Sequence, residues 1–205
     1  MQGYILDVKP VKDDDLIVTI LTPTRVYTTY RFYGARHSNI NVGYKIDFEI
    51  EHNLRSDIGR LRDVMQLNYE WILDAKKMYA WQRFIKLFYY HFKDIEELDE
   101  FYFDLLNALS HLMIKQNEKR AIIQAYLKLL EHEGRLHVDY TCFLCDIEIE
   151  GEISLVRSFV PAHPQCTFAR KFKLSKIKEM FEQNSLINFS DDEIKYLWHI
   201  LLQGL

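Results

Sequence analysis

All three cysteines of this chain lie in two short stretches, and this placement restricts the fold more than any other feature of the sequence. Cys142 and Cys145 form a CxxC pair, and His163 and Cys166 form an HxxC pair after the 17 intervening residues 146–162. A CxxC turn brings two sulfur atoms close enough to share one metal ion, and this separation between the pairs is typical of two zinc knuckles. The sequence therefore predicts that both pairs fold around one zinc ion.

A site made from these four residues has no open coordination position. Three thiolates and one imidazole complete a tetrahedron, so the pattern predicts a structural zinc ion and not a catalytic one. Two alternatives stay open: ordinary thiols without a metal, and a zinc-dependent hydrolase in which one of the four residues does not bind the ion. The segment between the pairs alternates in polarity and contains Gly151, which predicts a hairpin that bridges the two knuckles.

The cysteine count and the first residues indicate the compartment. Three cysteines cannot all be paired, which argues against a disulfide framework and suits a reducing compartment. The stretch MQGYILDVKPVKDDD reaches charged residues too early for a cleavable signal, and no apolar run approaches the roughly 18 residues that cross a membrane. We therefore expect a cytoplasmic globular protein with no membrane partner.

The first 65 residues carry strand signals. In YKIDFEIEH, apolar and charged residues alternate strictly, which is the period of a half-buried antiparallel strand. Three β-rich runs precede it and are separated by turn residues: QGYILDVKP, LIVTILT and VYTTYRFYG. Several short strands in so few residues predict a small closed barrel, or a sheet wrapped on itself, over residues 1–65.

After residue 65 the apolar period is that of helices. Residues 67–92 contain neither glycine nor proline, and their apolar residues recur at spacings of three, four or seven. Residues 101–113 and 122–130 repeat the helical pattern. These segments predict three helices in succession.

Two end signals complete the helical part of the chain. Gly134 is placed to end the third helix, and Ser190 with Glu193 forms a capping box at the start of the last one. We therefore expect an α+β protein in which residues 66–205 form a helical domain, with the zinc-binding insertion at about 138–170.

The acidic clusters give no reason to expect an enzyme. Asp13, Asp14 and Asp15 are typical of a polar turn between strands, with a metal site as the alternative. The run DIEELDEF is typical of an exposed, acidic helix start, with an acid–base pair as the alternative. The sequence contains no glycine-rich loop that could hold a phosphate group. We therefore expect a protein without catalytic residues.

Two groups of basic residues are candidates for contact with nucleic acid. In the first group, arginine and aromatic residues are interleaved, as on surfaces that hold single strands: Arg25, Tyr30, Arg31, Phe32 and Arg36. The second group follows the HxxC pair in TFARKFKLSKIK, a run without an acidic residue: Arg170, Lys171 and Lys173. A net charge of −4 requires that any such surface be a local patch. An ordinary barrel surface and a solvated helix start are the alternatives for the two groups.

The order of these features resembles the RecO family of bacterial recombination mediators. Four stretches are similar to its oligonucleotide-binding (OB) barrel: KDDDLIVTILT, YGARHS, DFEIE and LRDVM. LLNALSHL and AYLKLLEHEGRLHVDYTCFLC are similar to its helical domain as it runs into the zinc knuckle. The chain departs from the family pattern at Asp146, where glycine is usual, and at His163, where a second cysteine pair usually begins.

The resemblance implies a DNA-repair protein that is not an enzyme. It implies binding to single- and double-stranded DNA, annealing of complementary strands, and partnership with RecR in loading RecA on DNA coated by single-stranded DNA-binding protein. Contacts would be made mostly with the DNA backbone, by scattered lysines and arginines. The alternative from another class is a zinc-stabilised protein-interaction adaptor that carries an OB-like barrel.

The resemblance also implies a site for the acidic C-terminal tail of the coating protein. Because the overall charge is −4, that site would need a local basic rim around an apolar pocket. In the family the pocket belongs to the helical domain, where basic residues lie near the expected helix ends: Lys115, Lys119, Arg120 and Lys128.

Overall fold

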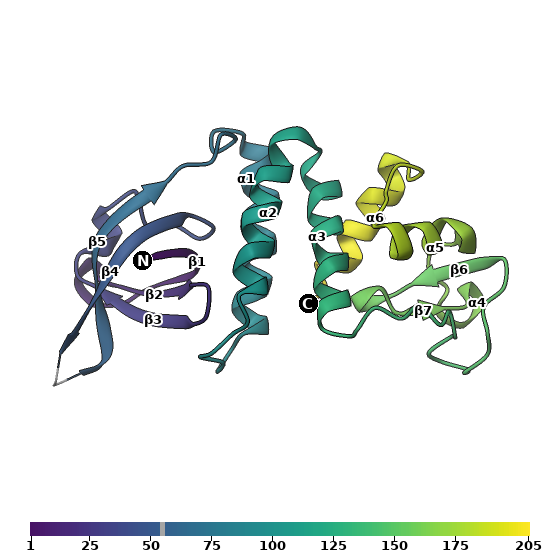
Figure 1. The fold of residues 1–205 in the computed structure, drawn as a ribbon, viewed down its shortest axis with the longest axis horizontal. Coiled ribbons are helices and arrows are strands. Elements are labelled where there is room, and N and C mark those ends of the chain that lie inside the picture. The colour runs from purple at the N-terminus through teal and green to yellow at the C-terminus, as the bar shows by residue number, and fades with distance from the viewer. Residues whose placement is uncertain (54–55) are drawn as a thin grey trace. The chain divides into compact units, whose positions relative to one another are not determined.

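The computed structural model describes residues 1–53 and 56–205. The chain divides into two compact units, Met1–Glu118 and Lys119–Leu205, and each is described here by itself. The boundary expected after residue 65 is a different division, because it marks the change from strands to helices. Strands followed by helices confirm the expected α+β class (Figure 1).

The first unit contains a closed barrel. Its strands are β1 (Gln2–Pro10), β2 (Leu16–Leu21), β3 (Val26–Arg31), β4 (Lys45–Asn53) and β5 (Ser56–Leu67). They are hydrogen-bonded in the order β1-β2-β3-β5-β4, as Figure 1 shows. Neighbouring strands are antiparallel except β3 and β5, which pair in parallel at Thr29–Gly59 and Tyr30–Arg60. The predicted closed barrel is therefore confirmed.

The strand alternation decides which side chains fill the barrel. Ile46 and Phe48 of β4 are buried, as the alternation in YKIDFEIEH predicts. They belong to a core formed by apolar residues from β1, β2, β4, β5 and one loop: Ile5, Leu16, Val18, Ile20, Ile40, Ile46, Phe48 and Leu61. Because Val18 points inward, its neighbour Ile17 lies on the outer face, beside Lys9 of β1 and Tyr30 of β3.

Two helices of the first unit pack against the barrel, α1 (Ala75–His91) and α2 (Phe101–Lys115). The ring of Tyr4 in β1 lies 5.9 Å from the ring of Trp81 in α1 and 5.3 Å from that of Phe103 in α2. The Trp81 indole also donates to the Gly43 carbonyl at 2.7 Å. These aromatic contacts explain why α1 and α2 form one compact unit with the strands.

Helix α1 begins later than the apolar period predicts. The Asp74 carboxylate accepts hydrogen bonds from the amides of Lys76 and Lys77, which makes Asp74 the N-cap. Trp71 lies before this cap, and its indole donates to the Ser110 carbonyl at 2.8 Å. The expected helix over 67–92 is therefore wrong in its first turns, because Trp71 is buried in a connection that precedes the helix and not on a helix face.

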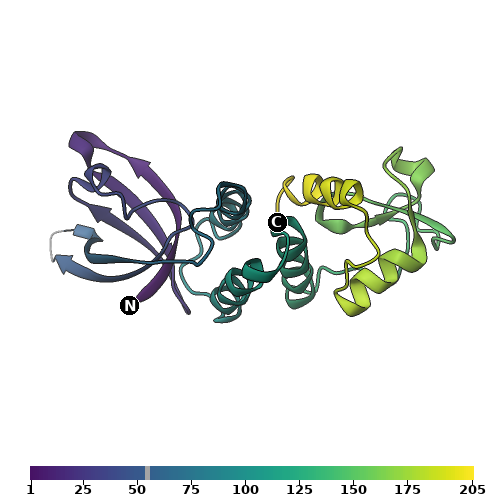
Figure 2. The ribbon, with the colours of Figure 1, turned by 90° about the horizontal axis from the view of Figure 1, so that it is seen from above.

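The second unit contains helices and a small sheet. Its helices are α3 (Glu118–His132), α4 (Pro164–Thr167), α5 (Leu174–Gln183) and α6 (Asp191–Leu201), and its strands are β6 (Glu152–Leu155), β7 (Pro161–Ala162) and β8 (Phe172–Lys173). Figure 2 gives a second view of these elements. Single 3₁₀ turns occur at Lys12–Asp14, Gly34–Arg36 and Arg157–Phe159. Within the described residues, none of the helices combines the length and the apolar character needed to span a membrane.

The predicted end of the third helix is confirmed, and the predicted turn of the hairpin is not. Gly134 follows α3 with φ of 65°, and the Arg135 amide returns to the Leu130 carbonyl at 2.7 Å. A hairpin does lie between the knuckles, but its turn is formed by residues 156–160, which join β6 to β7. The residues before Gly151 do not pair with β6, because β8 occupies its other edge.

The predicted capping box of α6 is present and supports a pH-dependent prediction. The Ser190 hydroxyl accepts from the Glu193 amide, and the Glu193 carboxylate accepts from the Ser190 amide and from the Lys176 ammonium at 2.6 Å. Burial alone raises the pKa of Glu193, but the Lys176 ammonium and the Ser190 groups outweigh it and hold that pKa below its usual value. A lowered pKa means that the ionised carboxylate stabilises the folded state.

Replacing Glu193 with glutamine is therefore expected to lower the free energy of unfolding of the second unit at neutral pH by about 1–3 kcal/mol. The deficit should shrink as pH falls through the folded pKa of Glu193, because the wild type then loses the same charge. Denaturant unfolding at several pH values measures both effects. Asp192→Asn is the control, since Asp192 pairs with Lys195 at an exposed position and should contribute little. An equal deficit at every pH would contradict the prediction.

Candidate metal centre and nucleic-acid interface

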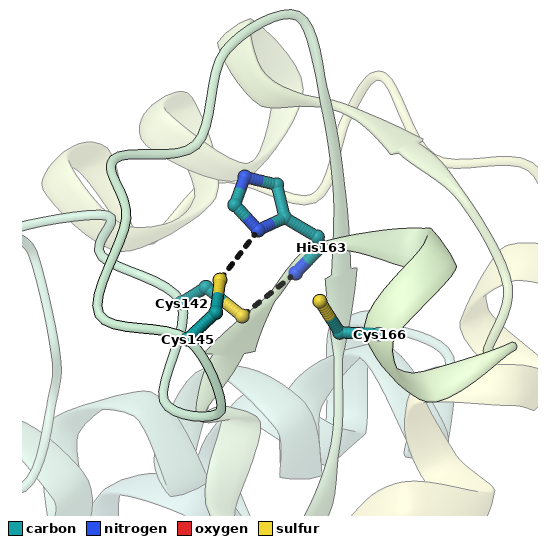
Figure 3. A group of neighbouring side chains, drawn as sticks. All are labelled: Cys142, Cys145, His163 and Cys166. Carbon is teal, nitrogen blue, oxygen red and sulfur yellow. Dashed lines mark hydrogen bonds between the residues drawn. The ribbon is translucent and has the colours of Figure 1, made fainter.

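The structure brings the four predicted zinc ligands together. The donor atoms of Cys142, Cys145, His163 and Cys166 all lie within 4.8 Å of one another, and Figure 3 shows the side chains converging. Cys145 Sγ lies 3.3 Å from His163 Nδ1. In a zinc tetrahedron with Zn–S bonds of about 2.3 Å, sulfur atoms lie about 3.8 Å apart. The donor set and its spacing therefore fit one zinc ion, as the sequence predicts.

Hydrogen bonds within two turns position these ligands. In the first turn the Asp146 amide donates to the Cys142 carbonyl at 2.9 Å, which closes the loop around Cys145. The second turn starts at His163, and α4 then places Cys166 one turn along, with its amide bonded to the His163 carbonyl at 3.0 Å. The His163 amide reaches across to Cys142 Sγ at 3.3 Å. The protein's own hydrogen bonds therefore already connect the two knuckles.

The thiol pKa values indicate why a cation belongs here. Burial raises the pKa of Cys142, but the amides of His163, Leu144 and Cys145 stabilise its thiolate and lower that pKa to about 6. Burial and the neighbouring thiols Cys145 and Cys142 raise the pKa of Cys166 to about 11. The surrounding amides thus favour the Cys142 thiolate, whereas the neighbouring sulfur atoms disfavour the Cys166 thiolate unless a positive ion lies beside it. Zinc held by these four residues would supply that charge and cross-link the two knuckles.

Asp146 occupies the position where the resemblance leads us to expect glycine. Its φ of 55° is left-handed, a conformation that costs most L-residues about 1–2 kcal/mol, although aspartate tolerates it better. Asp146→Gly is therefore expected to raise the free energy of unfolding of the second unit by about 0.5–1 kcal/mol, despite the greater freedom of glycine in the unfolded chain. Zinc-saturated denaturant unfolding measures the change.

Asp139→Gly provides the matched control for that prediction. Asp139 is an exposed aspartate in the same segment, but its φ is not positive. Glycine there should lower the stability, because it adds freedom to the unfolded chain and relieves no strain. Equal effects of the two substitutions would show that charge, and not backbone conformation, is responsible.

Two residues of the first group of predicted nucleic-acid contacts, Tyr30 and Phe32, form a cluster on the outer face of the barrel. Phe32 is 45% exposed, and the edge of the Tyr30 ring meets it at a centroid distance of 4.9 Å. The guanidinium of Arg60 in β5 lies 5.0 Å from the centre of the Phe32 ring. An exposed ring flanked by a cation is the arrangement on which bases of a single strand stack.

The polar turn predicted at Asp13–Asp15 is present, and it supports this cluster. Asp15 is almost fully buried, and its carboxylate accepts from the Tyr30 hydroxyl and from the Tyr33 amide. Asp14 pairs with Arg36 at 2.8 Å, and the Arg36 guanidinium lies 4.9 Å from the Tyr33 ring. The acidic turn thus holds the loop that carries Phe32. Among the described residues, these carboxylates do not form a cluster that could hold a metal ion.

The remaining arginines of the first group have partners within the unit. Arg31 shares its face with the buried Leu16 and donates to the Leu61 carbonyl at 2.9 Å, so it lies partly inside the barrel. Arg25 is exposed but pairs with Glu97 at 3.2 Å, in the acidic segment before α2. We call that segment, which contains Glu96 and Glu97, the strap. It is bonded to the start of β3, where the Val26 amide donates to the Glu96 carbonyl at 2.8 Å.

A groove of about 720 Å³ lies beside this strap. Its wall includes Asp7 and Lys9 of β1, Ile17 of β2 and Tyr27 of β3, with the strap on the opposite side. The groove is open to solvent on the barrel and carries both cationic and aromatic side chains. It is therefore of a size and character to hold part of an extended ligand.

The second predicted group lies at β8 and is partly paired. Lys171 forms an ion pair with Glu152 at 2.9 Å, and Arg170 donates to the Asp192 carbonyl at 3.3 Å. Lys173 is exposed. Residues 136–156, which carry the first knuckle, contain five acidic residues and no lysine or arginine. Lys171 is therefore paired with an acidic side chain that is distant in the sequence.

The four basic residues expected near the tail-binding pocket differ in their contacts and in their exposure. Arg120 of α3 donates to the carbonyls of Leu186 and Phe189, each at 2.7 Å, and so holds the loop before α6. Lys128 of α3 and Lys115 of α2 are exposed, and Lys119 is half-buried. The contacts of Arg120 give it a role in the packing of the second unit.

Sequence reasoning missed Arg60 and Lys9. Both alternate outward on strands, but nothing in their local sequence connects them with Phe32 or Tyr30. The parallel register of Tyr30 with Arg60, and the antiparallel register of Lys9 with Ile17, bring them to one face. Only the strand order of the barrel carries that information.

The fold and this face define a class of protein. A closed five-stranded barrel with a helix after its strands, and with exposed aromatic and cationic side chains on its sheet, is an OB-type barrel. Comparison with protein families agrees: residues 1–72 match the family described as RecO N terminal. Over these residues the chain is similar to the RecO family, in agreement with the resemblance seen in the sequence. No curated protein gives a significant match to the chain.

Proposed function

We propose that this protein is a recombination mediator of DNA repair that binds single- and double-stranded DNA and anneals complementary strands. With RecR it would help to load RecA on single strands coated by single-stranded DNA-binding protein, whose acidic C-terminal tail it would also bind. The match of residues 1–72 to the RecO N-terminal family supports this proposal. Such a role would place the protein in the cytoplasm, where bacterial DNA lies.

The observation that carries the proposal is the exposed Phe32 ring between Tyr30 and the Arg60 guanidinium. Bases would stack on Phe32, and Arg60 and Lys9 would meet the phosphates along the outer face of the barrel. Arg25, Arg36 and Lys171 would add backbone contacts after exchange of their carboxylate partners for phosphate, and Arg170 and Lys173 would add further contacts. These steps are non-covalent, so no catalytic residue is required, and the zinc ion would have only a structural role.

Fluorescence anisotropy with labelled oligothymidylate tests the proposal. Binding should compete equally with unlabelled oligonucleotides of any sequence and weaken steeply as salt rises, because phosphate contacts release counterions. The same titration on an oligonucleotide coated with single-stranded DNA-binding protein should show a ternary complex, and RecR should strengthen it. Affinity that does not change with ionic strength would reject the proposed mode of binding.

The exposed surface of the metal centre favours a second candidate, a protein-interaction adaptor. Large apolar side chains around the two knuckles are unusually exposed: Phe143 (49%), Leu144 (54%), Ile147 (62%) and Phe168 (94%). Such residues often mark protein interfaces. An adaptor without a DNA function would give no anisotropy change with any oligonucleotide, which separates it from the mediator.

A further inference from the structure

One row of side chains on α1 combines lysine, arginine and tyrosine. Lys76, Tyr79, Arg83, Lys86 and Tyr90 follow one another at spacings of three and four residues, so they share one face of the helix. All five are exposed, and the two tyrosines are 60% and 62% exposed. We call these five residues the α1 row.

The α1 row is a positive surface on a negative protein. The 17 residues of α1 contain four lysines and arginines and no aspartate or glutamate, whereas the whole chain has a net charge of −4. The opposite face of the helix is buried through Trp81, Phe84 and Phe88, which fixes the direction in which the row points. From Lys76 to Tyr90 the row runs about 21 Å at 1.5 Å per residue.

A groove of about 500 Å³ lies beside the row and gives it a binding pocket. Val8, Asn41 and Val42 of the barrel line one side, and Tyr79, Arg83 and Lys86 line the other. Gln82 ties the two sides together, since its amide donates to the Val42 carbonyl at 3.1 Å. The groove therefore combines an apolar floor, an aromatic wall and a cationic rim.

The aromatic wall is held in position before any ligand arrives. Arg83 donates to the Tyr79 hydroxyl at 2.9 Å, and its guanidinium lies 5.7 Å from the centre of the Tyr79 ring. A ring that is already oriented loses little conformational entropy when a flat group stacks on it. Arg83 also keeps other N–H groups available for an anion, because a guanidinium has five.

We propose that the α1 row is a second binding surface for single-stranded nucleic acid. A base stacks against Tyr79 in the groove, and the flanking phosphates lie against Arg83 and Lys86. The proposal rests on the proposed function and extends it. Val8 lines this groove, and its neighbours Asp7 and Lys9 line the larger groove of the barrel, so the two grooves reach β1 at adjacent residues. Successive side chains of β1 point to opposite faces, so the two grooves lie on different faces of this strand and form separate binding surfaces.

The pair of exposed tyrosines favours nucleic acid over an acidic peptide. A site for a peptide of aspartates and glutamates would need only cations, because such a peptide has no flat group that could stack on a tyrosine. In the row each tyrosine has a cation within four positions along the helix, which is the mixture used on single-strand surfaces. Binding of an acidic peptide is one of the outcomes that the test distinguishes.

The test compares short and long oligothymidylates on the full chain. Tyr79→Ala combined with Arg83→Ala is expected to weaken binding of a long oligothymidylate by about 10- to 100-fold, from the loss of one stacked base and one phosphate contact. Binding of an oligonucleotide just long enough for the barrel face should not change. Both residues are exposed, so the fold should persist, and circular dichroism checks this. Lys128→Ala, which removes one exposed cation from α3, is the control and should leave both affinities unchanged.

Phe32→Ala distinguishes a failure of this proposal from a failure of the proposed function. If Phe32→Ala weakens all oligonucleotides while the α1 variant weakens none, the proposed function stands and the α1 row is not part of it. If neither variant has an effect, both proposals fail. An α1 variant that loses only the binding of a polyglutamate peptide would overturn the nucleic-acid assignment in favour of a peptide site. Independently, photo-crosslinking with bromodeoxyuridine-substituted DNA should give adducts on Tyr79 or Tyr90, and adducts confined to the barrel would contradict the proposal.

Discussion

Cys142→Ser is expected to release zinc and unfold the metal-bearing part of the second unit while the barrel stays folded. Cys142 is the buried ligand, and its sulfur also accepts the amide of His163 at 3.3 Å, so the substitution removes a metal bond and a contact between the two knuckles. Zinc affinity should fall by at least about 100-fold, which lowers the free energy of unfolding by about 2.7 kcal/mol when free zinc exceeds both dissociation constants.

Elemental analysis and limited proteolysis measure this result. The wild type should retain about one zinc ion per chain after washing with a weak chelator, and the variant should retain much less and be cut within residues 138–170. Gln165→Ser is the control, because Gln165 lies between His163 and Cys166 in the same turn but offers no ligand, and it should keep its zinc. A chelator-washed wild type with no metal and an intact fold would show that the four residues are ordinary side chains.

Phe32→Ala combined with Arg60→Ala is expected to give the largest loss of DNA binding. Stacking of one base on an aromatic ring contributes about 1–3 kcal/mol, so removing Phe32 should weaken binding of single strands by about 5- to 150-fold. Removing the Arg60 charge should also lower the slope of log affinity against log salt by about 0.7 for a single strand. Anisotropy titrations with oligothymidylate at several salt concentrations give both quantities.

Phe168→Ala is the matched control for the barrel variant. Phe168 is a phenylalanine that is even more exposed than Phe32, at 94% against 45%, but it lies beside the metal centre. Phe168→Ala should therefore leave DNA affinity unchanged if exposed aromatic side chains contribute to binding only on the barrel face. A loss of equal size in both variants would mean that binding follows overall hydrophobicity, and the barrel face would lose its special role.

The sequence by itself determined those features whose signals act over a few residues. The alternation in β4 predicts the burial of Ile46 and Phe48, because successive side chains on a strand point to opposite faces. Gly134 and the capping box at Ser190 predict helix ends for the same local reason, since they satisfy backbone groups within one turn. The spacing of the cysteines predicts that the four ligand side chains converge, because each knuckle is a local turn.

The tertiary structure alone decided which distant residues meet. The parallel pairing of β3 with β5 places Arg60 over Phe32, whereas Arg31, an equally good candidate by sequence, lies partly inside the barrel. Likewise, the composition of α1 can be read from the sequence, but only the packing of its Trp81 face against the barrel shows that the basic row points outward. Local patterns set the period of each element, and the pairing of elements far apart in the chain depends on how their buried faces fit together, which no short stretch of sequence contains.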